Sequence, residues 1–162
     1  MKKIIILALL SFILLSLAGC DLFGFLNSDK MSVGDKFVDD ESNSNGIENS
    51  KMEYVSHDKN SLTVHIVNNS GSAWQSGNMR DYELQVKKDG EWYRVEQKGE
   101  FANTMEAMIF THGQELTHTF VFTERYGELE AGQYRVVKNY WATATEDREA
   151  GAFYLDCEFT VE

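Results

Sequence analysis

Six stretches between residues 62 and 161 alternate apolar and polar side chains with a period of two, which predicts half-buried β-strands. The last stretch is the clearest, because Phe153, Leu155, Cys157, Phe159 and Val161 share one face. No long amphipathic helix is indicated, and residues 101–110 show only a partial helical period that fits a loop or a strand equally well. The predicted strands cover residues 62–67, 82–87, 92–95, 116–123, 134–141 and 153–161.

Two short segments predict how these strands are joined. Asp89-Gly90 lies between two alternating runs, and both residues tolerate the positive φ of a type I′ hairpin turn. Gly132 lies two residues before Tyr134 at the start of a strand, which is the arrangement of a tyrosine corner. In that corner the glycine would provide the turn, and the phenol hydroxyl would bond back to the backbone of the preceding connection.

The spacing of the strands predicts the fold class. About seven short strands with frequent turn residues over about 110 residues indicate an all-β protein, built as an antiparallel β-sandwich. Antibody domains carry a disulfide cysteine two residues after the corner tyrosine, and here that position is Val136. We therefore expect a sandwich that is held together by packing.

The first fifty residues follow a different pattern. Lys2 and Lys3 precede an apolar run over residues 4–18 that is too short to span a bilayer comfortably, as in a secretory signal. Residues 27–51 are rich in Ser, Asn, Asp, Gly and Glu and lack a sustained period, which predicts a flexible tether. An uncleaved membrane anchor or an ordinary secretory signal are the alternatives for the apolar run.

The end of the apolar run, Leu17-Ala18-Gly19-Cys20, resembles the lipobox of bacterial lipoproteins. The resemblance implies a diacylglycerol on Cys20, cleavage just before it, and a lipid anchor on the extracytoplasmic face of the cell membrane. Two acyl chains anchor a protein stably where one would be marginal. The expected organisation is a signal peptide over 1–19, a lipidated N-terminus and tether over 20–51, and a folded domain over 52–162.

The net charge limits the classes of binding partner, and the cysteine content limits the possible disulfides. The formal charge is -11, and cleavage would remove Lys2 and Lys3 and make it -13. A surface this acidic argues against nucleic acid, whose phosphates need clustered Lys and Arg. With Cys20 lipidated, Cys157 is left alone, so no internal disulfide is expected. Its strand position places Cys157 inward as a small apolar side chain.

Several segments resemble a bacterial Ig-like domain that occurs in small lipoproteins and at the ends of other extracytoplasmic proteins. Residues 81–93 match its segment YxLEKKxDGxWY, and three later segments match in order. Ala131 departs from the family, which usually has proline before the glycine. The resemblance covers about residues 53–162 and implies a fold and a compartment, with no shared activity or catalytic residues to carry over. The later segments are 126–129, 132–138 and 153–161.

Candidate catalytic and metal-binding residues are sparse. The four histidines include no pair at i, i+2 or i, i+4, and no second cysteine is left for a zinc site. His65 falls on the polar face of its strand, whereas His118 shares the apolar face, as an interior or a rim residue. No phosphate-binding glycine loop or nucleophile elbow is present. We expect no catalysis, no metal and no cofactor.

Binding is the function that remains. Ig-like domains usually make contacts through loops at the ends of the sandwich, here residues 69–78, 97–104 and 143–151. Trp74 and Trp141 are the candidate exposed anchors, because tryptophan dominates interface energetics; packing on the rim of the sandwich is the alternative. The main hypothesis is a module that binds a protein or an envelope component. The second is a sandwich that presents a loop to a protease as a proteinase inhibitor.

Overall fold

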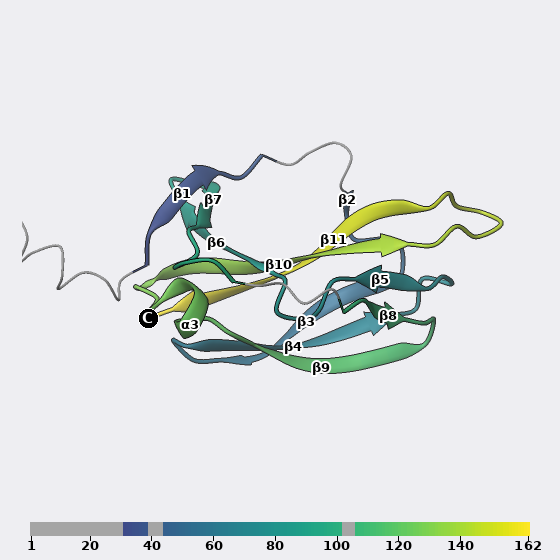
Figure 1. The fold of residues 1–162 in the computed structure, drawn as a ribbon, viewed down its shortest axis with the longest axis horizontal. Coiled ribbons are helices and arrows are strands. Elements are labelled where there is room, and N and C mark those ends of the chain that lie inside the picture. Colours follow the sequence, from purple (N-terminus) through teal and green to yellow (C-terminus); the bar gives the residue numbers. More distant parts are fainter. Residues whose placement is uncertain (1–30, 39–43, 102–105) are drawn as a thin grey trace, which may run out of the picture. The chain divides into compact units, whose positions relative to one another are not determined.

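The computed structural model describes residues 31–38, 44–101 and 106–162, and Figure 1 shows their arrangement. Almost all regular structure in them is β-strand. The elements are β1 (Val33–Lys36), β2 (Ser44–Asn45), β3 (Ser50–His57), β4 (Ser61–Asn68), β5 (Trp74–Ser76), β6 (Glu83–Lys88), β7 (Glu91–Val95), β8 (Met108–Phe110), β9 (Gln114–Val121), α3 (Thr123–Tyr126), β10 (Gly132–Ala142) and β11 (Gly151–Val161).

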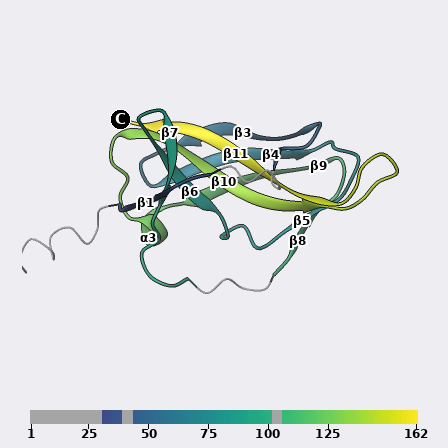
Figure 2. The ribbon, with the colours of Figure 1, turned by 90° about the horizontal axis from the view of Figure 1, so that it is seen from above.

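Two sheets face one another. One has the strand order β3-β4-β9, and the other has the order β1-β7-β6-β10-β11-β2, with β5 joined to β10 and β8 joined to β5. The long strands of the two sheets run along the same general direction (Figure 2), as in aligned sandwiches. Apart from the short parallel pair β11-β2, the pairings are antiparallel. The predicted all-β, Ig-like antiparallel sandwich is confirmed.

The alternation along the strands produces the core. On β11 the predicted apolar face, Phe153 to Val161, is buried, and so is Cys157. Burial raises the pKa of the Cys157 thiol to about 11, with Asp156 and Glu158 adding to the shift, so the sulfur stays a protonated apolar group. Six of the predicted strands are present, as β4, β6, β7, β9, β10 and β11.

Both predicted connections are confirmed in their main feature. Asp89 and Gly90 have φ values of 52° and 84°, and they join Lys88 to Glu91 in a two-residue hairpin. The Tyr134 hydroxyl donates a 2.8 Å hydrogen bond to the carbonyl oxygen of Glu130. Gly132 acts differently from the expectation, because its φ is not in the left-handed region.

Gly132 is the first residue of β10, and its role is close packing. A Cβ atom at this position would lie 3.4 Å from the ring of Tyr134. That distance is at the short limit of ordinary van der Waals contact, so the glycine lies directly against the phenol ring. The corner is therefore built from this contact and the hydrogen bond from Tyr134 to Glu130, and the hydroxyl also lies 3.5 Å from the Met31 sulfur.

The prediction of a flexible tether up to residue 51 is wrong for its later part. β1 pairs with β7 at one edge of the larger sheet, β2 pairs with β11 at the other edge, and β3 begins at Ser50. Phe37 follows β1 and lies beside Tyr154, with ring centroids 6.4 Å apart, and beneath the Arg135 guanidinium at 5.2 Å. Polar composition concealed these strands, because they are short and use few apolar side chains.

The membrane-related predictions fall on Cys20 and the segment before it, which lie outside the described residues. In the part of the chain that the structure describes, no helix is long and apolar enough to cross a membrane.

Candidate functional site

One edge of β10 is only partly paired. β6 pairs with residues 134–137 of β10, and β5 pairs with Trp141 and Ala142. Neither strand pairs with residues 138–140, because the connection over residues 77–82 leaves the sheet between β5 and β6. This break in the strand pairing opens a depression in the side of the sandwich.

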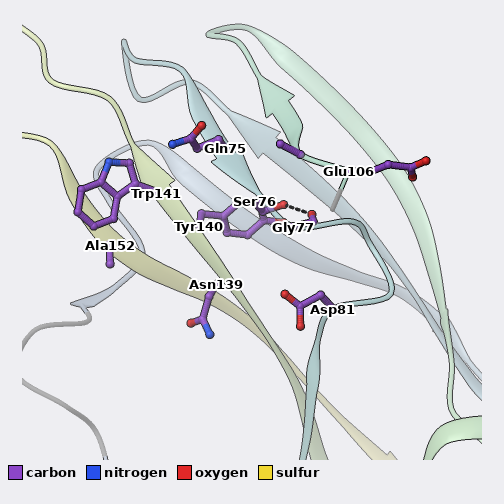
Figure 3. Close-up of a pocket in the computed structure, with 10 residues that line it drawn as sticks. Gln75, Ser76, Gly77, Asp81, Glu106, Asn139, Tyr140, Trp141 and Ala152 are labelled. Atoms are coloured by element: carbon purple, nitrogen blue, oxygen red, sulfur yellow. Dashed lines mark hydrogen bonds between the residues drawn. The ribbon is translucent and has the colours of Figure 1, made fainter. Parts of the chain in front are cut away.

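The depression has a volume of about 520 Å³, and we call it the Trp141 pocket (Figure 3). The Trp141 indole, which is 47% exposed, supplies its largest accessible apolar surface. Ala152 lies opposite Trp141 on β11, and this small side chain leaves the indole uncovered. The pocket is lined by Gln75, Ser76, Gly77, Asp81, Glu106, Ala107, Asn139, Tyr140, Trp141 and Ala152.

The polar groups of the pocket come from separate segments. Gln75 lies on β5, Asn139 on β10, Asp81 in the β5–β6 connection and Glu106 just before β8. Their amides and carboxylates provide hydrogen-bond donors and acceptors beside an aromatic surface. This combination suits a ligand that has an apolar face together with hydroxyl or amide groups.

Gly77 shapes the wall of the pocket. A Cβ atom at this position would lie 2.9 Å from a carboxylate oxygen of Asp81. The Ser76 hydroxyl donates a 2.7 Å hydrogen bond to the Gly77 carbonyl, which holds the start of the connection (Figure 3). The Asp81 carboxylate can approach this backbone only because the residue is glycine.

The prediction that Trp74 is an exposed anchor is wrong. Its side chain is 0% exposed and packs edge-on against Phe153, with centroids 5.2 Å apart. Its indole N–H donates to the Ser70 hydroxyl at 2.9 Å. Trp74 pairs with Ala142, whereas Trp141 pairs with Gln75. The two tryptophans therefore belong to adjacent register positions that face opposite sides of the sheet.

Trp141 is exposed, as predicted, but it lies on the side of the sandwich and not among the loops at its end. The Trp141 pocket is lined by strand residues and the β5–β6 connection, not by the loop over 143–151. Two of the predicted contact loops do meet elsewhere. Ser70, Gly71, Thr145 and Arg148 line a separate depression of about 480 Å³ with residues 47–49.

Among the described residues no group of three or more His, Cys, Asp or Glu side chains lies close enough to hold a metal ion. His65 lies on the outer face of its strand, 3.2 Å from a Glu115 carboxylate oxygen. His118 is half-buried. Burial and the nearby charge of Lys138 lower its pKa, so the His118 imidazole is neutral at pH 7.

Sequence reasoning missed a buried lysine beside the Trp141 pocket. Lys138 is 1% exposed, and its ammonium donates a 2.7 Å hydrogen bond to the Asp81 carbonyl. Its pKa is lowered to about 8, mainly by burial; Asp81 opposes this shift and Arg125 contributes to it. The signal was present, since Lys138 shares its parity with Tyr134, Val136 and Tyr140 on β10.

The sheet order, the corner at Tyr134 and the disulfide-free core agree with an Ig-like fold, and a family model described as a bacterial Ig-like domain matches residues 41–153. The chain belongs to the bacterial Ig-like domain family. No curated protein and no solved structure matches it. The family match begins inside the predicted tether, in agreement with the early strands. The Ig-like domain adds β1 before the match and continues to the end of β11 after it.

Proposed function

We propose that this protein is a lipid-anchored, extracytoplasmic lipoprotein whose Ig-like domain binds a protein or an envelope component through the Trp141 pocket. The observation that carries the binding proposal is the half-exposed Trp141 indole beside amide and carboxylate groups at a break in the strand pairing. An exposed tryptophan in a depression is the kind of residue that contributes most to binding. The Ig-like domain family supports an interaction module, and binding without catalysis is what we propose.

The lipobox-like ending at Cys20 supports the anchor. The chain between Cys20 and β1 comprises residues 21–32. Fully extended, such a segment reaches at most roughly 45 Å. The Ig-like domain would then work close to the membrane on which it is anchored.

Replacing Trp141 with Ala tests the binding proposal. The full-length protein and its Trp141→Ala variant would be used to capture partners from envelope extracts of the host, with proteins and cell-wall polymers both recovered. We expect capture to fall by roughly tenfold or more for the variant. Tyr54→Ala is the matched control, because Tyr54 is an aromatic residue of similar exposure (52%) on the other sheet. Equal capture by the wild-type protein and the Trp141→Ala variant would rule out this pocket.

The proteinase-inhibitor alternative makes a different prediction. An inhibitor would insert an exposed loop into the protease cleft, whereas the Trp141 pocket lies between strands. A panel of proteases assayed with the full-length protein separates the two functions, because only the inhibitor would leave the protease substrate uncut.

A further inference from the structure

Arg125 is buried, and the described part of the chain gives it no acidic partner. Its side chain is 7% exposed, and its guanidinium carbon lies 5.5 Å from the ring centroid of Tyr82 and 5.0 Å from that of Phe101. Among the described residues no carboxylate forms an ion pair with Arg125 and no side chain or carbonyl accepts a hydrogen bond from its guanidinium, whose nitrogens are not among the fully buried atoms and therefore remain open to solvent. A buried guanidinium is normally paired, because an unpaired buried charge is costly.

The aromatic rings satisfy only part of what this group requires. Stacking uses the flat faces of the guanidinium and its positive charge. The N–H donors lie in the plane of the group, in a fork that matches the two oxygens of a carboxylate. For Arg125 these donors have no acceptor in the described part of the protein, so they are available to a ligand.

Arg125 lines a cavity of about 370 Å³ between β9, α3 and the β5–β6 connection, and we call it the Arg125 cavity. Aromatic rings from Tyr82, Phe101 and Phe120 form much of its wall. Arg80 and Arg125 bring positive charge, and Glu124 is the acidic residue among the described lining residues. A cationic cavity is unusual on a chain with a formal charge of -11, which points to a role in binding an anion.

We propose that the Arg125 cavity binds a carboxylate attached to an apolar group. The N–H groups of Arg125 pair with the carboxylate oxygens, and the rings of Tyr82, Phe101 and Phe120 contact the apolar part. A free aromatic acid and the C-terminal residue of a polypeptide both offer this chemistry. The site does not include Trp141, so it is separate from the binding function proposed above.

The geometry of the donors and the apolar walls favour a carboxylate over phosphate. Arg80 and Arg125 attract an anion of either kind against the single opposing charge that Glu124 supplies among the described lining residues, so the charges alone do not select between them. One planar guanidinium is matched by one planar carboxylate. A bare inorganic anion has no apolar part, so it would leave the apolar walls of the cavity without a contact.

The test uses the full-length chain in non-ionic detergent, with benzoate as the probe. Binding would be followed by the NMR signals of the His118 imidazole, which report on the cavity itself. We expect benzoate to bind roughly tenfold or more tightly than its neutral analogue benzamide, because charge-assisted hydrogen bonds are the stronger ones. Inorganic phosphate should bind more weakly than benzoate. Tighter binding of N-acetylphenylalanine than of benzoate would identify a polypeptide C-terminus, and the reverse would identify a free aromatic acid.

Variants separate a binding role from a structural one. Arg125→Gln should weaken benzoate binding by roughly tenfold or more, and Arg125→Lys should also weaken it, because lysine keeps the charge but lacks the paired donors. Arg94→Gln is the control, since Arg94 is an exposed arginine paired with Glu83 on the outer face of the larger sheet. If the Arg125 variants do not fold, the comparison of benzoate, benzamide and phosphate on the wild-type chain still decides the question. Equal binding of benzamide, tighter binding of phosphate, or full affinity in a folded Arg125→Gln variant would overturn the proposal.

Discussion

The Tyr134 hydroxyl donates a 2.8 Å hydrogen bond to the carbonyl oxygen of Glu130, four residues earlier in the chain. This bond closes the connection from α3 into β10 across a single turn. The ring of Tyr134 stacks on Phe159 of β11, with centroids 5.7 Å apart. The corner therefore links the entry of β10 to the core without a disulfide.

Removal of that hydroxyl should destabilise the domain. Tyr134→Phe keeps the ring and removes the part-buried hydrogen bond to the Glu130 carbonyl, so we expect the free energy of unfolding to fall by about 1 kcal/mol. Urea denaturation followed by tryptophan fluorescence measures the change. Tyr93→Phe is the control, because no hydrogen bond to the Tyr93 hydroxyl is present in the described residues. A loss of the same size in both variants would mean that the corner has no special role.

The two tryptophans on neighbouring register positions should behave in opposite ways. Trp74→Ala removes a fully buried indole that contacts Phe110, Tyr140 and Phe153, and should cost about 3–5 kcal/mol of unfolding free energy. Trp141→Ala should change the unfolding free energy by less than about 1 kcal/mol, because the indole is half-exposed. Urea denaturation of both variants tests the contrast, and comparable losses would contradict the placement of the two side chains.

Lys138 should make stability depend on pH. Its pKa is about 8 in the folded protein and 10.5 as the ordinary value, so the unfolded chain binds more protons between these pH values. The contribution of Lys138 to the free energy of unfolding therefore rises with pH from about 8 to 10.5. Below pH 8 the protein carries the full free-energy cost of burying the charged ammonium. Asp81 and Arg125 act electrostatically on Lys138, and Lys138 in turn acts on His118.

The Lys138→Met variant isolates that contribution. The unfolding free energy of the variant minus that of the wild type should be about 2 kcal/mol larger at pH 7 than at pH 9.5. Comparing a difference at two pH values removes the constant cost of leaving the Asp81 carbonyl without its donor. A difference that does not change with pH would mean that Lys138 keeps its ordinary pKa.

The lipid anchor predicts where a cysteine variant is found. Cys20→Ser removes the sulfur that would carry the diacylglycerol, so the protein should leave the membrane fraction on cell fractionation. Cys157→Ala is the matched control and should stay in the membrane fraction, because this buried thiol takes no part in anchoring. Full retention of the Cys20→Ser protein in the membrane would show that another segment holds it there.

The local pattern of apolar and polar residues was sufficient to predict a strand wherever one face of that strand is buried. The alternation on β11 and the Asp89-Gly90 turn each depend on residues that are adjacent in the chain, so their effect could be read directly. The donor and the acceptor of the tyrosine corner are only four positions apart in the chain. By contrast β1 and β2 are short, polar strands whose formation depends on unpaired edges supplied by β7 and β11.

The candidate sites show the same division. The sequence indicated Trp74, in a loop rich in Ser, Gly and Asn, and Trp141, at the end of a strand, as equal candidates for exposed anchors. Their difference arises from the register of β5 on β10, which turns one indole into the core and leaves the other outside. The parity of Lys138 on its strand indicated burial but not its partner, and Arg125 gave no local signal, because the surroundings of both come from segments distant in the chain.

By itself, the sequence determined the all-β class, the main strands, the hairpin at Asp89-Gly90 and the inward position of Cys157, because a period of two and turn preferences act over neighbouring residues. Only the tertiary structure decided the break in pairing along β10, the burial of Trp74 and the position of Arg125 between aromatic rings. Those features depend on which strands pair and in which register, and such long-range contacts are not encoded in any local pattern.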